Sequence, residues 1–394
     1  MSYKKIYLNP KKEESIKRFH PWIFSGAIHH ADGTPEEGEI VEVYDSQKRF
    51  LALGHCQIGS IAVRILTFRN EPVNKEFWRK RFEVAYQLRQ SLHLIHPLNN
   101  AYRLIHGEGD NMPGLIVDIY GNTAVVQAHS AGMHIMRKEL AQALKEVMGD
   151  AIEHIYYKSE NTLPFKAELE PENTYLLGGT NVSGLILENG LNFRVDWVKG
   201  QKTGFFVDQR DNRSLLEKYA QGRNVLNLFG YTGGFSCYAL RGGARLVHSV
   251  DSSLKAVLLA DENVALNFPD DKRHQSFAED AFKYLEKAGG QYDLLVVDPP
   301  AFAKHRNVLK NALQGYRKLN VAAFEKIQSG GILFTFSCSQ AVSKDDFRLA
   351  VFSAAARSGR KVKILHQLAQ PADHPINIYH PEGEYLKGLV LAVE

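Results

Sequence analysis

The stretch NVLNLFGYTGGFSCYAL, residues 224–240, decides the fold of the C-terminal half of the chain. It joins an apolar strand to a glycine-bearing turn and then to the start of a helix. Gly230, Gly233 and Gly234 allow the backbone of this turn to approach a ligand closely. Taken alone, the pattern fits an ordinary strand-to-helix turn equally well, so its meaning depends on the later strands and helices of the chain.

After residue 190, the sequence alternates expected strands with expected helices. The strands are predicted at residues 225–229, 246–251, 294–298 and 332–337, and the helices at residues 234–241, 254–267, 281–287 and 317–327. This alternation predicts an α/β domain with a mostly parallel sheet that is covered on both faces. Such sheets bind ligands at the carboxyl ends of their strands, where the strand order reverses.

Acidic residues stand at two of these expected strand ends, and a third follows another strand-like stretch. Asp251 ends ARLVHSVD, where a carboxylate can accept hydrogen bonds from both ribose hydroxyls of an adenosine. Asp280 follows a strand-like stretch, and it or the next amide could contact an adenine amino group. Asp298 ends DLLVVD before two prolines, which stop the strand and hold the carboxylate at the crevice. The turn at 230–234 lacks Gly-x-Gly-x-x-Gly, which counts against a dinucleotide and leaves room for S-adenosylmethionine.

Two further domains are expected before this one. Residues 1–70 are predicted as a small β-barrel, because the strands in WIFSGAI, GEIVEVYD, FLALGHC and IAVRIL are short and closely spaced. Residues 71–188 are predicted as a middle α+β domain, with a helix over 76–95, a hairpin at Gly121-Asn122 and a helix stopped by Gly149. Residues 189–394 form the α/β domain.

The composition is that of a folded globular protein. Of the 394 residues, 44% are hydrophobic and 23% are charged, and the net charge is +4. The start of the chain is charged where a signal peptide is apolar, and no apolar run is long enough for a membrane span. We therefore expect a cytoplasmic protein without a membrane partner. The basic residues concentrated in 4–18 indicate either a phosphate-facing patch or a solvated surface.

The cysteines and histidines fit neither a disulfide framework nor a metal site. Cys56, Cys237 and Cys338 lie far apart in the sequence, which is typical of a reducing compartment. The chain has 16 histidines, but the pairs in HLIH (His93, His96) and IHH (His29, His30) bring no carboxylate or cysteine at ligand spacing, so we expect no metal. Cys56 and Cys237 are predicted as core residues.

Several motifs together resemble a known family. GQKTGFFVDQRDNR, LNLFGYTGGFS, VDSS, AEDAF, DLLVVDPPAF and FTFSCS are similar to motifs of class I S-adenosylmethionine-dependent RNA methyltransferases. FHPWIFSGAI with GEIVEVYD looks like the start of a PUA domain, an RNA-binding barrel. The best likeness is to the ribosomal RNA large-subunit methyltransferase I family, which forms 5-methylcytosine in 23S rRNA. It implies a PUA-like barrel, a middle domain, a Rossmann-like methyltransferase domain, S-adenosylmethionine as cofactor and 23S rRNA as partner.

The resemblance also implies which residues bind the cofactor. They are Phe229, Gly230, Tyr231, Thr232 and Gly233 in the turn, Asp251 and Ser252 at the ribose, Asp280 and Ala281 near adenine, Gln209 and Arg213 near the methionine end, and Asp298 at the crevice. A guanidinium can bind the methionine carboxylate by two hydrogen bonds, which suits Arg213. A structural salt bridge is the alternative for that residue.

Cys338 lies between two serines, directly after the apolar strand and in the sheet that carries Asp298. Carbon 5 of cytosine is a poor nucleophile, and a thiolate that adds to carbon 6 makes it reactive enough to take a methyl group. We therefore predict Cys338 as the nucleophile and Asp298 as the residue at the cytosine ring edge. A small core cysteine is the alternative. Many RNA 5-methylcytosine enzymes carry a second cysteine where this chain has Ala301, so the base that removes the carbon 5 proton is not identified.

Other functions fit the same residues. Asp-Pro-Pro followed by an aromatic, here Phe302, also serves methyl transfer to a base nitrogen of guanine or adenine. A non-catalytic RNA-binding protein would bind no cofactor, and a nicotinamide oxidoreductase is disfavoured by the missing phosphate-binding pattern. The sequence leaves the oligomeric state open, a homodimer included.

Overall fold

The computed structural model describes residues 3–164, 169–180, 183–303 and 306–394. The chain forms two compact units that are interleaved in the sequence. The first unit consists of Met1–Ile186, Val195–Val207 and Ala372–Gly383, and the second consists of Leu187–Arg194, Asp208–Pro371 and Glu384–Glu394. The division into domains at residues 70 and 188 stays a prediction.

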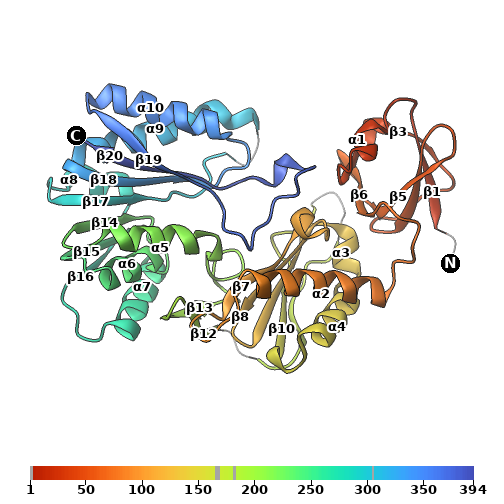
Figure 1. Ribbon diagram of the computed structural model, residues 1–394, viewed down its shortest axis with the longest axis horizontal. Helices are drawn as coiled ribbons and strands as arrows, with labels where there is room; N and C mark the ends of the chain where they lie inside the picture. Colours follow the sequence, from red (N-terminus) through yellow and green to blue (C-terminus); the bar gives the residue numbers. More distant parts are fainter. Residues whose placement is uncertain (1–2, 165–168, 181–182, 304–305) are drawn as a thin grey trace. The chain divides into compact units, whose positions relative to one another are not determined.

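The N-terminal part of the first unit is a six-stranded sheet with the order β2-β6-β5-β4-β1-β3 (Figure 1). Neighbouring strands are antiparallel, except for the parallel pair β1 and β4. Alternate apolar residues, such as Val41 and Val43, fill its core. WIFSGAI is two strands joined by a short 3-10 helix, not one strand. The elements are β1 (Lys4–Leu8), α1 (Glu14–Lys17), β2 (Trp22–Phe24), β3 (Ile28–Ala31), β4 (Ile40–Tyr44), β5 (Phe50–Cys56) and β6 (Ile61–Thr67).

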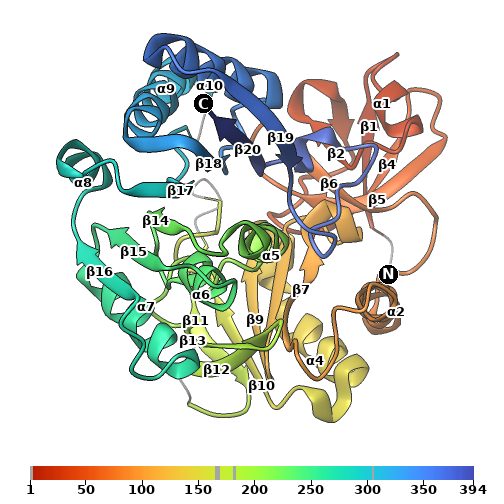
Figure 2. The same ribbon diagram turned by 60° about the vertical axis from the view of Figure 1, so that its left-hand side comes forward.

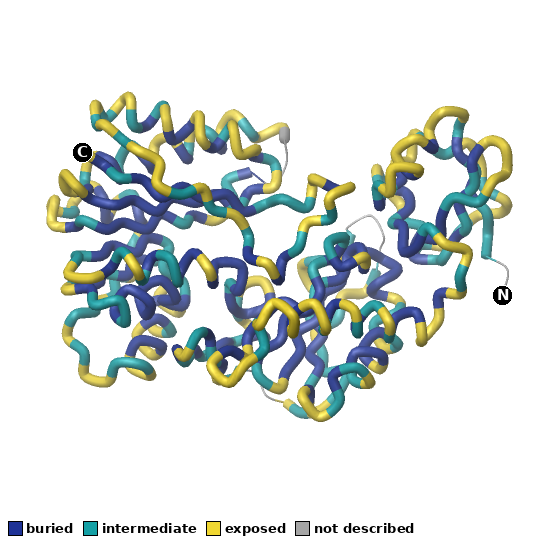
Figure 3. The backbone as a smooth tube through the Cα atoms, in the orientation of Figure 1, coloured by how far each residue is buried: buried dark blue, intermediate teal, exposed yellow. Residues whose placement is uncertain are grey.

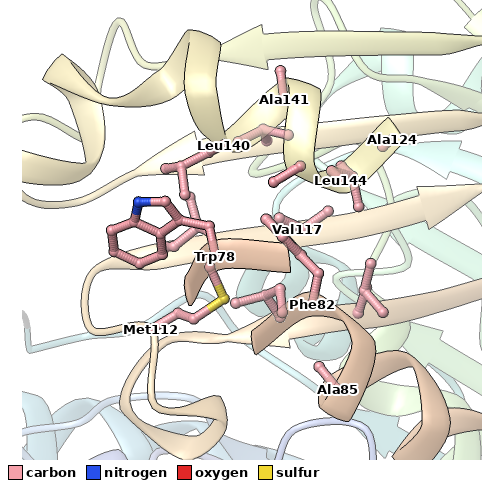
Figure 4. Close-up of a cluster of buried hydrophobic side chains, with 14 of the residues drawn as sticks. Trp78, Phe82, Ala85, Met112, Val117, Ala124, Leu140, Ala141 and Leu144 are labelled. Carbon is pink, nitrogen blue, oxygen red and sulfur yellow. The ribbon is translucent and has the colours of Figure 1, made fainter. Parts of the chain in front are cut away.

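The next part of the first unit is a five-stranded sheet with the order β11-β10-β9-β8-β7. Figure 4 shows how Trp78 and Phe82 of one helix and Leu140 and Leu144 of another pack with Val117 of the sheet. The elements are α2 (Lys75–Ser91), β7 (Ala101–His106), a 3-10 helix (Gly107–Asp110), β8 (Leu115–Tyr120), β9 (Thr123–Ala128), α3 (Ala131–Ile135), α4 (Arg137–Met148), β10 (His154–Lys158) and β11 (Asn173–Leu177). A separate two-stranded sheet contains β12 (Ser183–Glu188) and β13 (Leu191–Asp196).

The structure confirms most of the elements predicted for this part. The hairpin between β8 and β9 turns at Gly121-Asn122, and Gly149, with a φ of +54°, ends α4. The helix predicted over 76–95 ends earlier, at Ser91. The following predicted helix is two helices, because the chain leaves helical geometry at Met136 between α3 and α4.

The second unit is built on a seven-stranded sheet with the order β16-β15-β14-β17-β18-β20-β19 (Figure 2). Its strands are parallel except for β20, and the strand order reverses between β14 and β17. Helices α9 and α10 cover one face, and α5, α6 and α7 cover the other (Figure 1). The elements are α5 (Arg210–Tyr219), β14 (Asn224–Leu228), α6 (Gly234–Arg241), β15 (Leu246–Asp251), α7 (Leu254–Asn267), β16 (His274–Ala278), α8 (Ala281–Lys287), β17 (Tyr292–Val297), α9 (Leu309–Lys326), β18 (Ile327–Ser337), α10 (Lys344–Ser358), β19 (Val362–Leu368) and β20 (Lys387–Val393).

Two covered faces explain why the central strands read as continuous apolar runs. All four residues of β17 from Leu294 to Val297 are fully buried, and the central strands are dark blue in Figure 3. The predicted α/β class is confirmed, and three of the four predicted helices have the predicted bounds. The helix predicted over 317–327 was too short, because α9 begins at Leu309 and buries Ala312 and Tyr316 on the same face.

Candidate active site

The carboxyl ends of β15, β14, β17 and β18 lie side by side in the second unit. These strands are parallel, and one row of paired residues crosses all four of them: Val250, Leu228, Val297 and Thr335. The sequence-predicted residues come within three positions after this row: Phe229 to Gly230, Asp251, Asp298 and Cys338. The sheet therefore brings the predicted cofactor turn, both acidic residues and the cysteine to one edge.

The turn after β14 has an unusual backbone conformation. Phe229, Tyr231 and Gly233 have φ values of +60°, +44° and +75°. Positive φ is uncommon for residues other than glycine and costs roughly 1–3 kcal/mol, and such residues cluster at functional sites. At Gly233, a Cβ atom would also lie 3.0 Å from the Cβ of Ala260 in α7. The turn is thus held in a strained shape by its surroundings.

Asp251 ties this turn to the end of the neighbouring strand. Its Oδ2 accepts a hydrogen bond from the backbone N–H of Tyr231 at 3.0 Å, and its Oδ1 accepts one from Ser253 at 2.9 Å. Each carboxylate oxygen can accept a second hydrogen bond, so both remain able to bind a hydroxyl donor. Ser252 is exposed beside it. Both predicted ribose residues therefore lie at the strand end, with the carboxylate orientation fixed by the backbone.

Asp280 and Ala281 begin the next helix, α8. The Asp280 carboxylate accepts hydrogen bonds from the N–H groups of Phe282 at 3.0 Å and Lys283 at 3.1 Å, so it caps the helix. Ala281 is buried. The backbone N–H of Glu279 donates to the carbonyl oxygen of Asp251 at 2.9 Å and joins this segment to the end of β15. The adenine contact of Asp280 and Ala281 stays a prediction.

Asp298 is held by a chain of two amides. The Gln209 side chain donates from Nε2 to Oδ2 of Asp298 at 3.0 Å. Asn212 donates to Oε1 of Gln209 at 2.6 Å, which fixes the orientation of the Gln209 amide. Gln209 is buried, so this contact is shielded from water. Gln209 was predicted at the methionine end of the cofactor, and its observed partner is the strand-end carboxylate.

Arg213 forms the salt bridge that was the alternative to its predicted contact with the cofactor. Its Nε and an Nη donate to the two carboxylate oxygens of Glu188 at 2.9 and 2.7 Å. The Tyr238 hydroxyl donates to the same carboxylate at 3.0 Å, and Glu188 has no exposed surface. Burial acts to lower the pKa of Arg213, but the charge and hydrogen bonds of Glu188 outweigh it, so the pKa is raised. Contact of Arg213 with the cofactor stays a prediction.

The two serines beside Cys338 anchor the end of β18. Ser337 donates to the hydroxyl of Tyr316 at 2.9 Å, and Ser339 donates to the carbonyl of Ala303. Both serines are fully buried, whereas Cys338 is half-buried. Its Sγ lies 3.8 Å from the carbonyl oxygen of Pro299, next to Asp298. The serines thus fix the backbone, and the thiol reaches the partly exposed edge that carries Asp298.

Cys237 lies in helix α6 and not at the strand edge. Cys237 is fully buried, and burial raises its pKa to about 12, as expected for a core thiol. Among the residues that the structure describes, no group of three or more His, Cys, Asp or Glu side chains is arranged to hold a metal ion. In the same residues, no helix combines the length and apolarity that crossing a membrane requires.

Comparison with known proteins agrees with this geometry. The S-adenosylmethionine-dependent methyltransferase family matches residues 160–387, and the PUA-like domain family matches residues 6–68. Proteins named ribosomal RNA large subunit methyltransferase I from Alteromonas mediterranea and Aeromonas salmonicida are each 40% identical to this chain over 98% of both sequences. The chain belongs to this methyltransferase I family. S-adenosylmethionine is therefore its cofactor, and the PUA-like domain and the methyltransferase domain are confirmed.

Solved structures show the same architecture. The methyltransferase SMU.776, solved in complex with SAH, is 25% identical, with 100% of both chains covered and a TM-score of 0.85. A SAM-dependent methyltransferase from Streptococcus mutans is 24% identical over 100% of both chains, with a TM-score of 0.84. The Trm5b structure from Pyrococcus abyssi, 17% identical with a TM-score of 0.54, shares the fold.

The strand-end residues fit the cofactor of this family. Asp251 keeps acceptor positions for two hydroxyls, and Gly230, Gly233 and Gly234 leave room for a close approach to the backbone of the turn beside it. Three residues that contact the predicted site or its strand ends were missed by sequence reasoning: Glu188, Asn212 and Lys387, whose Nζ donates to the carbonyl oxygen of Ser339 at 2.6 Å. Lys387 precedes the apolar stretch GLVLAV and resembles an ordinary exposed lysine at a strand end, yet it is buried. The sequence contains no local signal for its role.

Proposed function

We propose that this chain methylates carbon 5 of a cytosine in 23S ribosomal RNA through a covalent adduct with Cys338. The main support is the position of the Cys338 sulfur, half-buried at the strand edge and 3.8 Å from the carbonyl oxygen of Pro299. The names of the relatives and the PUA-like domain support ribosomal RNA as the substrate. The cytoplasmic location stays a prediction, and the homodimer stays open.

The chemistry requires a nucleophile and a fixed group at the ring edge. Sγ of Cys338 adds to carbon 6 of cytosine, which forms a C–S bond and moves the double-bond electrons toward carbon 5. S-adenosylmethionine supplies an electrophilic methyl group, and carbon 5 accepts it. Loss of the carbon 5 proton then restores the double bond and expels the thiolate. Asp298, oriented by Gln209, binds the ring edge and stabilises the charge that develops there.

Methyl transfer to a base nitrogen is the second candidate. It depends on the Asp-Pro-Pro motif and on an aromatic side chain that stacks on a flipped base. Phe302, the aromatic residue of this motif, packs against Tyr316 with ring centroids 4.7 Å apart. It is also close to the backbone of α9, since a Cβ at Gly315 would lie 2.9 Å from its ring. Because stacking of Phe302 on a flipped base would suit either reaction, the role of Cys338 is what distinguishes them.

The Cys338→Ala variant tests the proposal. In cells that lack this protein, we expect 23S rRNA to lose one 5-methylcytosine, which the wild type restores and Cys338→Ala does not. Mass spectrometry of rRNA nucleosides provides the measurement. Cys56→Ala, which changes a barrel cysteine, serves as the matched control and should restore the methyl group. If Cys338→Ala restored 5-methylcytosine, the nucleophile role of Cys338 would be wrong. If the missing methyl group lay on a base nitrogen and Cys338→Ala restored it, the second candidate, methylation of a nitrogen, would replace the proposal.

The covalent adduct can be trapped directly. In 23S rRNA transcribed with 5-fluorocytidine, carbon 5 carries fluorine in place of the proton that must leave, so the C–S bond persists after methylation. We expect a protein–RNA complex that survives denaturing electrophoresis with the wild type and S-adenosylmethionine. Cys338→Ala should give none. Calorimetry should show that this variant still binds S-adenosylmethionine, and a wild type without cofactor binding would instead indicate a non-catalytic RNA-binding protein.

A further inference from the structure

A buried lysine from another strand lies under the turn that carries Cys338. Lys387 begins β20, which runs antiparallel to β18, and its Cα is paired with that of Ser337. Only 4% of Lys387 is exposed. Its Nζ donates hydrogen bonds to the carbonyl oxygens of Ser339 at 2.6 Å and Val342 at 2.7 Å. The ammonium group therefore fixes the backbone directly after the cysteine.

Several charged groups lie close enough to Lys387 to change its pKa. Within the described residues it forms no ion pair with a carboxylate, although burying an ammonium without one is costly. Burial lowers the pKa of Lys387 to about 8. The charges of Cys338 and, more weakly, of Glu384 raise this pKa, whereas the charge of Lys344 lowers it further. Lys344 and Glu384 are themselves paired. Among these groups, the Cys338 thiol is the one with the largest favourable interaction.

Tyr316 also interacts with the thiol, and it carries no charge at neutral pH. Burial raises the pKa of Tyr316 to about 12, and the charges of Cys338 and Asp298 act in the same direction. Asp298 is negative, so it does not favour a thiolate nearby. Lys387 is a cation that the described part of the fold supplies at this strand end.

We propose that Lys387 is a positioning residue for Cys338: it fixes the turn that carries the thiol, and its ammonium stabilises the thiolate. The reactive form of cysteine is the thiolate, and a nearby lysine lowers the cost of forming it. The effect is strong at a buried site, because the low dielectric increases the attraction between opposite charges. The inference rests on the proposed nucleophile role of Cys338, but its test requires neither RNA nor cofactor.

The test measures how the alkylation rate of Cys338 by iodoacetamide depends on pH. Mass spectrometry of the peptide that contains Cys338 separates it from the other two cysteines. In the wild type, we expect the midpoint of the rate profile below about 8.5, the value for a free cysteine. In Lys387→Met, the midpoint should rise by about one pH unit, which slows alkylation at pH 7 by about tenfold. Lys387→Arg, which keeps the charge, should stay near the wild type.

Two further variants separate charge from packing. Lys387→Gln retains N–H donors for the two carbonyls without the charge, so it carries the test if Lys387→Met does not fold. Lys363→Met removes an exposed lysine from the adjacent strand β19 and should leave the midpoint unchanged. A folded Lys387→Gln with the wild-type midpoint, or a wild-type midpoint at or above about 8.5, would overturn the inference. A shifted midpoint in a protein that forms no 5-methylcytosine would instead overturn the proposed function alone.

Discussion

Asp298 and Cys338, the two side chains proposed to act at the edge of the sheet, are both positioned by residues from distant parts of the chain. Gln209 holds the Asp298 carboxylate, and Lys387 holds the turn after Cys338. Such contacts position a reacting group within a few tenths of an ångström, and this positioning accounts for much of the rate that an enzyme gains. The residues that do not react are therefore the informative ones to substitute.

Gln209 provides a test at this scale, because the observed contact and the predicted contact differ. In Gln209→Leu, Asp298 loses its amide donor, and we expect kcat for methyl transfer to fall roughly 10- to 100-fold with little change in cofactor affinity. Methyl-transfer kinetics and calorimetry of S-adenosylmethionine binding measure the two quantities. Gln328→Leu, at an exposed position of β18, is the control. A large loss of affinity with kcat unchanged would instead place Gln209 at the methionine end.

Some of these residues could be predicted from the sequence, and others could not. Asp251, Asp298 and Cys338 each come after an apolar run, and parallel strands end at the same edge of a sheet. Lys387 contacts a carbonyl 48 positions away, and Glu188 binds Arg213 from 25 positions away. Neither pair has a spacing that a helix or a strand would impose, so only the folded structure reveals them.

At the scale of elements, the turn between β14 and α6 is the predicted cofactor turn, and its neighbours hold it in place. Its helix begins directly after Gly233, which has left-handed geometry and lies against α7. Asn263 of α7 donates to the carbonyl of Thr232 at 2.9 Å and fixes the other side of the turn. The glycines were predicted for close approach to a ligand. Gly233 is additionally required by its φ and by the packing of the two helices.

Gly233→Ala tests this turn. A Cβ there would face both the positive φ and the 3.0 Å approach to Ala260, so we expect a loss of about 1–3 kcal/mol in the free energy of unfolding. Gly290→Ala, in the loop before β17, is the matched control, since its Cβ would meet no atom within 4 Å. Urea unfolding followed by circular dichroism measures both. Equal stability of the two variants would show that the turn is not strained.

At the scale of the whole molecule, the two units are not consecutive in the sequence. Ala372–Gly383 comes after β19 of the second unit but belongs to the first. Arg89 of α2 donates to the carbonyl of Asp373 at 2.8 Å, and the Asp373 carboxylate accepts from the N–H of Arg103 at 3.0 Å. The sequence does not predict that Ala372–Gly383 belongs to the first unit, because the composition of this segment is that of an ordinary surface loop.

The two units should respond differently to acid. His55 of the first unit is 1% exposed, and burial lowers its pKa to about 4. An unfolded histidine has a pKa near 6.5, so the unfolded state binds more protons than the folded state between about pH 6.5 and about pH 4. The free energy of unfolding therefore falls as the pH decreases through this range, by up to roughly 3 kcal/mol. Burial also lowers the pKa of four more histidines in the described part of this unit, against two in that of the second unit: His106, His129, His134 and His380, against His248 and His274. The first unit should consequently unfold at a higher pH than the second.

Tryptophan fluorescence can report on the first unit separately, because Trp22, Trp78 and Trp197 all belong to it. Far-ultraviolet circular dichroism reports the unfolding of both units. During acid titration, we therefore expect the fluorescence change to be complete at a higher pH than the circular dichroism change. His55→Leu should move the fluorescence transition to lower pH, since neither ring nitrogen of His55 has a hydrogen-bond partner among the described residues to lose. His29→Gln, at an exposed position, should leave it in place. Coincident transitions that do not respond to His55→Leu would mean that the two units unfold as one and that this histidine does not control their acid stability.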